Sequence, residues 1–376
     1  MKRVLLVGGG HAHVFVMRAF GQQPPPDARV TVLSRSRFTP YSGMLPGLLA
    51  GLCTFEESHI DLAWLAGAAG CEFIVAEATR IDPVTRRVGC ADGSTLDYHL
   101  LSVDTGSTPA ADHVPGAREH ALPVKPVDGF VAGWRRLEAR IAAGERLRIA
   151  VVGGGAGSVE LLLSLQHRIR TAVGGQTRFL LVTDQADLLM THNRRVRAIF
   201  RDVLAARQVE IFFGHEVLRV EPHALHCAAS VRIEVDATIW VTTAAAPRWI
   251  AEAGLATDPR GFIAVNDRLQ SISHPDVFAA GDVASMVDHP RPKSGVFAVR
   301  QGPPLARNLR RALVGEALSD FTPQRTALAL IGTGDRCAVA SWGPFAAKGN
   351  WVWRWKRYID RRWMRNYLPS SPAGPT

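Results

Sequence analysis

Two parts of the chain, about 145 residues apart, repeat one pattern of apolar and polar positions. Each begins with a short, mainly apolar run, Val4–Val7 or Leu147–Val152, which is typical of a parallel strand buried on both faces. A glycine-rich turn and a segment with helical periodicity follow each run. A second apolar run, Val30–Leu33 or Phe179–Val182, completes each unit. The pattern therefore predicts two strand–turn–helix–strand units and an α/β fold.

The glycine turns predict a dinucleotide-binding site in each unit. Glycine permits the tight turn and lets the backbone approach a pyrophosphate. The helix that follows offers unpaired N–H groups and the positive end of its dipole to the phosphates. The expected contacts are Gly8, Gly10, His11 and His13 in the first unit, and Gly153, Gly155, Ala156, Gly157 and Ser158 in the second.

Both units depart from the full Gly-x-Gly-x-x-Gly fingerprint. His13 and Ser158 replace the third glycine, which predicts slightly wider packing of helix on strand. The acidic residue expected to bind a ribose is also missing, because Ser34 and Thr183 end the second strands and Asp184 follows one residue late. We expect these three residues to hydrogen-bond the riboses. For the two histidines of the first turn, contact with the dinucleotide and a packing role are both open.

Length and composition narrow the class of protein. A chain of 376 residues is too long for one ordinary core, so about two or three domains are expected. No apolar run reaches about 18 residues, so we expect no membrane-spanning helix. The apolar start is too short for a signal peptide and leads directly into the first glycine turn, which favours a cytoplasmic location. The five cysteines include no Cys-x-x-Cys pair, which argues against a disulfide framework or a zinc site, and no metal is expected.

The net charge of +10 is concentrated partly in a basic and aromatic segment, residues 351–368. Helical spacing there predicts an amphipathic helix that lies on a membrane surface or, alternatively, packs on the body of the protein or on a second subunit. Nucleic-acid binding is not expected, because no recognised module is present. The predicted apolar face carries Val352, Trp355, Ile359 and Trp363, and the basic face carries Arg354, Arg357, Arg361 and Arg365.

Three further segments carry a family resemblance. Leu100–Ser107, Trp240–Pro247 and Val277–Asp282 resemble, in order, the first crossing between domains, the return crossing and the second FAD signature of the pyridine nucleotide-disulfide oxidoreductase superfamily. The resemblance implies two interleaved Rossmann-like domains for FAD and NAD(P), with a small C-terminal α+β region ending in the amphipathic helix. The implied ranges are 1–118 and 247–318 for the FAD domain, 119–246 for the NAD(P) domain and 319–376 for the C-terminal region.

Absent cysteines indicate the branch of the superfamily. Disulfide reductases carry a redox-active pair in the segment equivalent to Phe38–Gly47, which has no cysteine here. The remaining resemblance is to the type II NADH dehydrogenases, which reduce quinones. Gly8–His13, Thr39–Gly47, Pro123–Pro126 and Ser294–Gly302 are also similar to the oxidoreductase module that is fused to selenide, water dikinase in some organisms.

The resemblance implies an FAD-dependent NAD(P)H oxidoreductase. A hydride would pass from nicotinamide to flavin, and electrons would then pass to a quinone-like acceptor. Two alternatives stay open: a flavoprotein in solution with another acceptor, in selenium or sulfur metabolism, and a non-catalytic redox sensor. The further flavin contacts implied are Pro40, Tyr41, Ser42, Thr105, Gly106, Gly281, Asp282 and Gly302, and the catalytic residues implied are Glu160, Lys293 and Gln301.

A helix is also expected to begin at Pro303, because proline suits the first helical position. In the superfamily this helix directs its positive end at the flavin. The choice between NADH and NADPH is open, and so is a homodimer. With the amphipathic segment on a membrane, the protein would be peripheral on the inner face of the cytoplasmic membrane.

Overall fold

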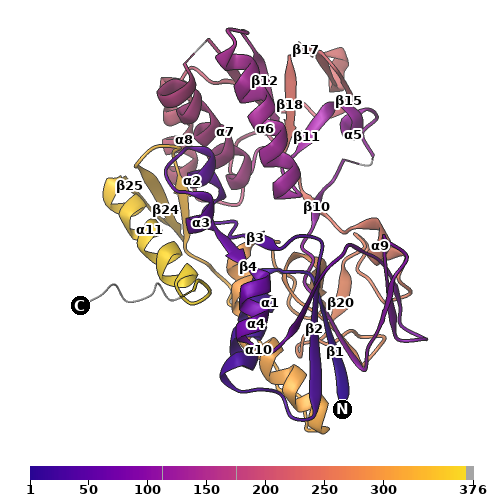
Figure 1. The fold of residues 1–376 in the computed structure, drawn as a ribbon. Helices are drawn as coiled ribbons and strands as arrows, with labels where there is room; N and C mark the ends of the chain where they lie inside the picture. Colours follow the sequence, from indigo (N-terminus) through magenta and orange to yellow (C-terminus); the bar gives the residue numbers. More distant parts are fainter. Residues whose placement is uncertain (112, 175, 370–376) are drawn as a thin grey trace.

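The computed structural model describes residues 1–111, 113–174 and 176–369. It contains two five-stranded parallel sheets, one above the other in Figure 1. The first has the order β21 (Val277–Ala279), β9 (Leu100–Val103), β1 (Lys2–Val7), β2 (Ala28–Ser34) and β5 (Glu72–Val75). The second has the order β11 (Ala121–Pro123), β18 (Ala237–Trp240), β12 (Arg148–Val152), β13 (Arg178–Val182) and β14 (Glu210–Phe212).

The two sheets confirm the repeated pattern and the α/β class. In each, the strand that precedes the glycine turn is central, and its apolar residues are buried on both faces. Helix α1 (His11–Gln22) follows the first turn and α7 (Ala156–Arg168) follows the second. Each helix leads into the neighbouring strand, β2 or β13, so both units end where the sequence predicts.

The chain crosses between the two sheets twice. The crossing segments meet as a short antiparallel pair, β10 (Thr108–Pro109) and β19 (Ala244–Ala245). Strand β21 then returns to the first sheet beside β9. We retain the ranges that end at residues 118, 246 and 318 as a proposed division into domains.

Smaller elements surround the sheets. The short strands are β3 (Phe38–Pro40), β4 (His59–Asp61), β6 (Ala78–Asp82), β7 (Arg87–Cys90), β8 (Thr95–Asp97), β15 (Val217–Glu221), β16 (Ala224–Cys227), β17 (Arg232–Glu234), β20 (Ile263–Val265) and β22 (Ala284–Met286). The remaining helices of the two-sheet body are α2 (Leu45–Leu49), α3 (Phe55–Ser58), α4 (Leu62–Ala68), α5 (Ala117–His120), α6 (Val127–Ala142), α8 (Arg194–Ala206), α9 (Arg248–Ala251) and α10 (Gly295–Val314).

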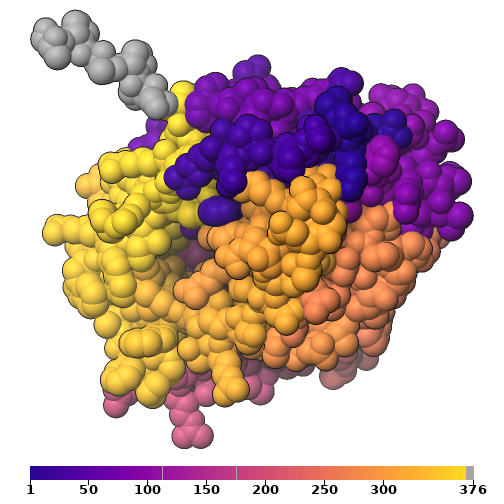
Figure 2. All heavy atoms as spheres, turned by 90° about the horizontal axis from the view of Figure 1, so that it is seen from below, coloured from indigo at the N-terminus to yellow at the C-terminus, as the bar shows by residue number. Residues whose placement is uncertain are grey.

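The C-terminal region is a three-stranded antiparallel sheet followed by a helix. Its elements are β23 (Ala329–Gly332), β24 (Ala338–Trp342), β25 (Phe345–Gly349) and α11 (Asn350–Met364). Figure 2 shows this region (yellow) directly against the N-terminal segment (indigo). Residues 370–376, which the predicted region includes, lie outside the described residues.

Helix α11 packs on the body of the protein, one of the alternatives considered for it. Its inner side packs on the body, since Val352, Asp360 and Met364 are buried. The predicted apolar face is therefore wrong in part, because Trp355 and Ile359 are exposed. Across the described residues, no helix has the length and apolar character needed to span a bilayer.

Candidate functional site

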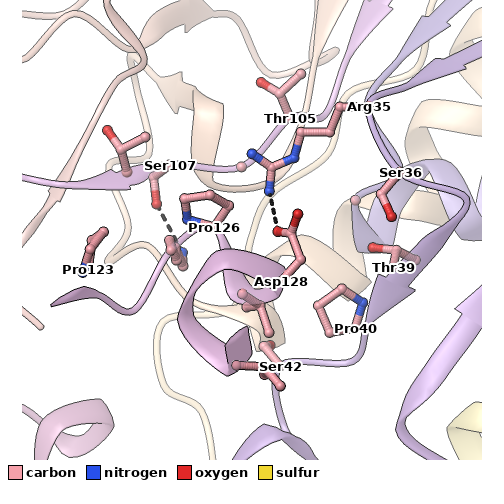
Figure 3. A pocket seen from close by; sticks show the side chains of 18 of the residues that line it. Arg35, Ser36, Thr39, Pro40, Ser42, Thr105, Ser107, Pro123, Pro126 and Asp128 are labelled. Atoms are coloured by element: carbon pink, nitrogen blue, oxygen red, sulfur yellow. Dashed lines mark hydrogen bonds and ion pairs between the residues drawn. The ribbon is translucent and has the colours of Figure 1, made fainter. Parts of the chain in front are cut away.

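A cavity of about 1020 Å³ lies at the carboxyl ends of β1, β2 and β9, between the two sheets (Figure 3). Open α/β sheets bind their ligands at this edge. Its walls come from the first glycine turn, the segment that follows β2, both crossings and the start of α6. The predicted flavin contacts in its lining are Gly8, Gly10, His11, Ser34, Pro40, Ser42, Thr105, Gly106 and Asp282.

The carboxylate of Asp104, just after β9, fills the space between the two flavin signatures. Its Oδ2 accepts the N–H groups of Ala12 and His13 at 2.9 and 3.1 Å. A Cβ on Gly10 would lie 2.2 Å from this carboxylate, and a Cβ on Gly281 would lie 2.3 Å from its Oδ1. Burial raises the pKa of Asp104 to about 7, although the two N–H donors act in the opposite sense.

The structure places His13 outside the cavity lining, in a packing role. Its Nδ1 lies 2.7 Å from the Gly8 carbonyl oxygen and its Nε2 lies 2.8 Å from Ser102 Oγ. Burial lowers the pKa of His13 to about 4, so the ring is neutral near neutral pH. A hydrogen-bonded ring thus replaces the third glycine of the fingerprint.

His11 faces the cavity. Its ring contacts those of Tyr41 and Trp363, with centroid distances of 5.4 and 5.5 Å. Its Nε2 is buried and has no hydrogen-bond partner in the described part of the chain. Tyr41 does not line the cavity but stacks on Trp363 at 4.4 Å and hydrogen-bonds to Asp360 of α11. Helix α11 therefore supports the wall that carries His11.

Gly281 and Asp282 form the second signature, where Gly281 has a φ of +69°. The Oδ2 of Asp282 accepts Lys125 Nζ at 2.8 Å and Ser107 Oγ at 3.2 Å. Burial is the largest single effect and raises the pKa of Asp282, but the charge of Lys125, the hydrogen bonds from Lys125 and Ser107 and the charge of Lys293 together outweigh it, and the net shift is downward. Lys125, which sequence reasoning did not assign to the site, thus ties the segment between β11 and α6 to the second signature. Figure 3 labels its neighbours Pro126 and Ser107.

Helix α10 corrects one expectation. It begins at Gly295 and contains Pro303 and Pro304 in its interior, so Pro303 is not its first residue. Gly295 and Ala298 of its first turn line the cavity. The positive end of the helix therefore faces the predicted flavin position from a point further upstream than expected.

Gln301, Gly302 and Lys293 lie outside the lining of this cavity. Gln301 Oε1 accepts the Gly281 N–H at 2.6 Å, so the side chain holds the second signature in place. Gly302 lets α10 approach α1, because a Cβ there would lie 2.6 Å from the Cβ of Phe15. Lys293 donates to the Ala284 carbonyl, and burial lowers its pKa to about 8.

The second glycine turn lies at the N-terminus of α7. Gly155 is the N-cap of this helix and receives no side-chain cap. Thr183 Oγ1 accepts the Gln185 N–H at 3.2 Å, and Gln185 Oε1 is buried without a partner in the described chain. The predicted NAD(P) contacts all lie outside the lining of the first cavity. They are Gly153, Gly155, Ala156, Gly157, Ser158, Thr183 and Asp184.

Glu160 connects α7 to the C-terminal region. Its Oε1 accepts the Gly332 N–H at 2.7 Å, and burial raises its pKa although Lys356 opposes the shift. Lys356 Nζ donates to the Gly43 carbonyl at 2.6 Å and to Asp360 Oδ2 at 3.2 Å. This buried polar cluster includes Lys356 and Asp360, two residues that sequence reasoning did not assign to a site because their partners lie in distant segments.

The first cavity fits an FAD. The backbone of the first glycine turn lines it at Gly8 and Gly10, where only glycine allows the close packing on Asp104, since a Cβ on Gly8 would lie 2.4 Å from the Asp104 carbonyl oxygen. The unpaired Nε2 of His11 and the positive ends of α1 and α10 suit an electron-rich, anionic ligand. Within the described residues, no group of three or more His, Cys, Asp or Glu side chains is arranged to hold a metal ion.

Comparison with known proteins decides the family. Residues 2–302 match the model of the pyridine nucleotide-disulphide oxidoreductases. The chain belongs to this family. The "NADH dehydrogenase-like protein MT1860" of Mycobacterium tuberculosis is 26% identical over 76% of the chain and 73% of that relative. A "Type II NADH:quinone oxidoreductase" of Staphylococcus epidermidis is 24% identical over 85% of both.

A solved structure extends the likeness over nearly the whole fold. The sulfide:quinone oxidoreductase of Aquifex aeolicus superimposes with a TM-score of 0.80, at 18% identity, over 99% of this chain and 93% of its own. These findings confirm the predicted pyridine nucleotide-disulphide oxidoreductase family and fold, and the relatives include NADH dehydrogenase-like proteins. The closer similarity to the module fused to selenide, water dikinase stays a prediction.

Proposed function

We propose that this chain is an FAD-dependent NADH oxidoreductase that passes electrons to a quinone-like acceptor. The observation that carries the proposal is one cavity walled by the first glycine turn, the 39–42 segment, Asp282 and the start of α10. The names of its relatives, NADH dehydrogenase-like protein and type II NADH:quinone oxidoreductase, support both the electron donor and the acceptor. NADPH is the alternative donor.

The residues of the cavity would hold the flavin dinucleotide and set its electrostatic surroundings. Bound FAD supplies a ring that accepts a hydride and passes electrons on. The backbone at Gly8 and Gly10, which lines the cavity, would lie beside its phosphates, and Asp282 would offer a carboxylate to its ribityl hydroxyls. The positive end of α10 stabilises negative charge on the ring. Cys53 is the only cysteine in the lining among the described residues, so the walls offer no dithiol relay.

Glu160 would act on the nicotinamide side. It projects from the second turn of α7, the helix to which we assign the NADH phosphates, and its raised pKa favours a carboxyl that retains a proton more readily than usual. We propose that it orients the nicotinamide. Gln301 is a positioning residue through Gly281, and Lys293 contributes charge near Asp282 without touching the cavity.

The outer side of α11 would contact a membrane surface. Trp351 and Trp355 are exposed on the helix, and Trp342 and Phe345 are exposed on the adjoining β24–β25 hairpin. Exposed arginines on the same helix suit anionic lipid headgroups. Flotation with anionic vesicles should show binding, and Trp355→Ser should weaken it about threefold or more without changing the melting temperature.

Anaerobic reduction tests the proposal. The FAD-loaded protein should lose its oxidised-flavin absorbance when NADH is added and regain it with a short-chain quinone. Glu160→Gln should keep the same FAD content but slow the reduction by about 10-fold to 100-fold. Flavin that stays oxidised in the presence of both NADH and NADPH would contradict the proposed reaction.

A further inference from the structure

We propose that Asp104 holds a proton whenever FAD is bound, so that the protein takes up one proton as it binds the flavin. This inference rests on the proposed function of the first cavity. It makes Asp104 a residue of the cofactor site, although no part of the sequence pattern assigns it there.

The carboxylate of Asp104 stands where a helix usually receives an anionic ligand. The first N–H groups of a helix have no partner within it and, with the helix dipole, attract phosphates. In α1, the N–H groups of Ala12 and His13 already donate to Asp104 Oδ2 at 2.9 and 3.1 Å. The Gly10 N–H donates to the backbone carbonyl of the same aspartate at 3.0 Å.

Asp104 has little freedom to withdraw when a phosphate approaches. Its backbone N–H is bonded to the Val7 carbonyl at 2.8 Å, which keeps it in register with β1. Its side chain lies between Gly10 and Gly281. The carboxylate occupies the space that a Cβ on either glycine would need, so it has no room to move towards them. The residue is 2% exposed, so water screens its charge poorly.

An ionised Asp104 would therefore repel the phosphates that the same turn attracts. No cation is bonded to it in the described structure, because Lys125 pairs with Asp282 at 2.8 Å. Binding of a proton removes the repulsion and leaves a carbonyl oxygen that still accepts the N–H groups of α1. Proton uptake and flavin binding are thus linked.

The other titratable groups at the site behave differently between about pH 6 and pH 8. Burial lowers the pKa of both His11 and His13 to about 4, so both stay neutral. The net lowering of the pKa of Asp282 keeps that group ionised. Burial lowers the pKa of Lys293 to about 8, so its loss of charge must be separated from the titration of Asp104, whose pKa burial raises to about 7.

The affinity for FAD should reveal the linkage. Apoprotein prepared by removal of the flavin is titrated with FAD between about pH 6 and pH 8, and binding is followed by fluorescence quenching. Wild-type affinity should fall about tenfold over this range, because FAD binds only to the protonated fraction. Asp104→Asn should bind at every pH as tightly as the wild type does at about pH 6. Lys293→Gln should retain most of the fall.

Calorimetry measures the proton directly in the unmodified protein. Titrations at about pH 8 in two buffers of different ionisation enthalpy should give an uptake of about one proton per FAD for the wild type and for Lys293→Gln, and none for Asp104→Asn. If Asp104→Asn does not fold, as judged by circular dichroism, the uptake in the other two proteins decides the matter.

Three results would overturn the inference: a wild-type affinity independent of pH, no proton uptake, or a folded Asp104→Asn variant that keeps the wild-type slope or binds no FAD. A wild-type protein that binds no FAD at any pH would instead overturn the proposed function of the cavity.

Discussion

The two glycine turns share a position in their sheets but differ in what surrounds them. Gly10 and Gly155 are the N-caps of α1 and α7, with extended backbone angles in both. A Cβ on Gly10 would collide with a buried carboxylate, whereas a Cβ on Gly155 would meet nothing within 4 Å. Both turns are closely packed before the N-cap, since a Cβ on Gly8 or on Gly153 would lie within 2.4 Å of a backbone oxygen. They differ at the N-cap itself, which is enclosed by Asp104 in the first turn and open in the second.

This difference suits two kinds of ligand. The first turn lines a deep cavity whose walls come from both crossings and from the helix that follows the second signature. Such a site favours a cofactor that stays bound. The second turn lies outside that cavity and is exposed at Gly155 and Gly157, which suits a co-substrate that enters and leaves in each cycle. The same local sequence pattern thus serves two binding modes because its neighbours differ.

The strongest way to break the comparison is to add one methyl group to each N-cap glycine. Gly10→Ala should lower the free energy of unfolding of the apoprotein by about 3 kcal/mol, because the new Cβ overpacks against Asp104. Gly155→Ala should cost less than about 1 kcal/mol, which is the usual effect at an N-cap. Urea unfolding of both variants measures the two values, and equal costs would show that the turns are not differently enclosed.

Substitution of His13 or Ser158, which replace the third glycine of the fingerprint, should have the next largest effect on the free energy of unfolding. His13→Leu leaves the Gly8 carbonyl and Ser102 without a partner and should cost about 2 kcal/mol at neutral pH. Ser158→Ala loses one hydrogen bond to the Gly155 carbonyl and should cost less than about 1 kcal/mol.

The cost at His13 should also depend on pH. Since burial lowers its pKa to about 4, the stabilising effect of His13 is complete above about pH 6.5 and is lost as the pH falls through about 4. The difference between wild type and His13→Leu should therefore shrink on acidification, as followed by urea unfolding at several pH values. A constant difference would show that the pKa of His13 is the same in the folded and the unfolded protein.

The smallest expected effects concern two glutamines, one beside each predicted nucleotide site. Gln301→Ala leaves the Gly281 N–H without its acceptor and should weaken FAD binding about tenfold. Gln185 has a buried Oε1 without a described partner, so Gln185→Ala should raise the KM for NADH about threefold and leave FAD affinity unchanged. FAD titration and steady-state kinetics measure the two effects. If Gln185→Ala weakened FAD binding and Gln301→Ala raised only the KM for NADH, the assignment of the two turns would be reversed.

Local sequence patterns predicted most of the fold and part of the candidate site. Buried apolar runs and glycine turns predicted the central strands correctly, since these features depend on neighbours in the sequence. The start of α10 was mispredicted because Pro303 is tolerated inside the helix. The residues that sequence reasoning missed, Asp104, Lys125 and Lys356, act through partners in other segments. Their roles depend on contacts between segments that are far apart in the sequence, and the periodicity of apolar residues does not predict such contacts.

The most direct test of the account is a crystal structure of the protein with both FAD and NADH. The account predicts flavin density in the first cavity, along Gly8 and Gly10 and beside His11 and Asp282, with NADH density at the N-terminus of α7. Flavin density at the second turn, or a first cavity filled by NADH, would contradict it.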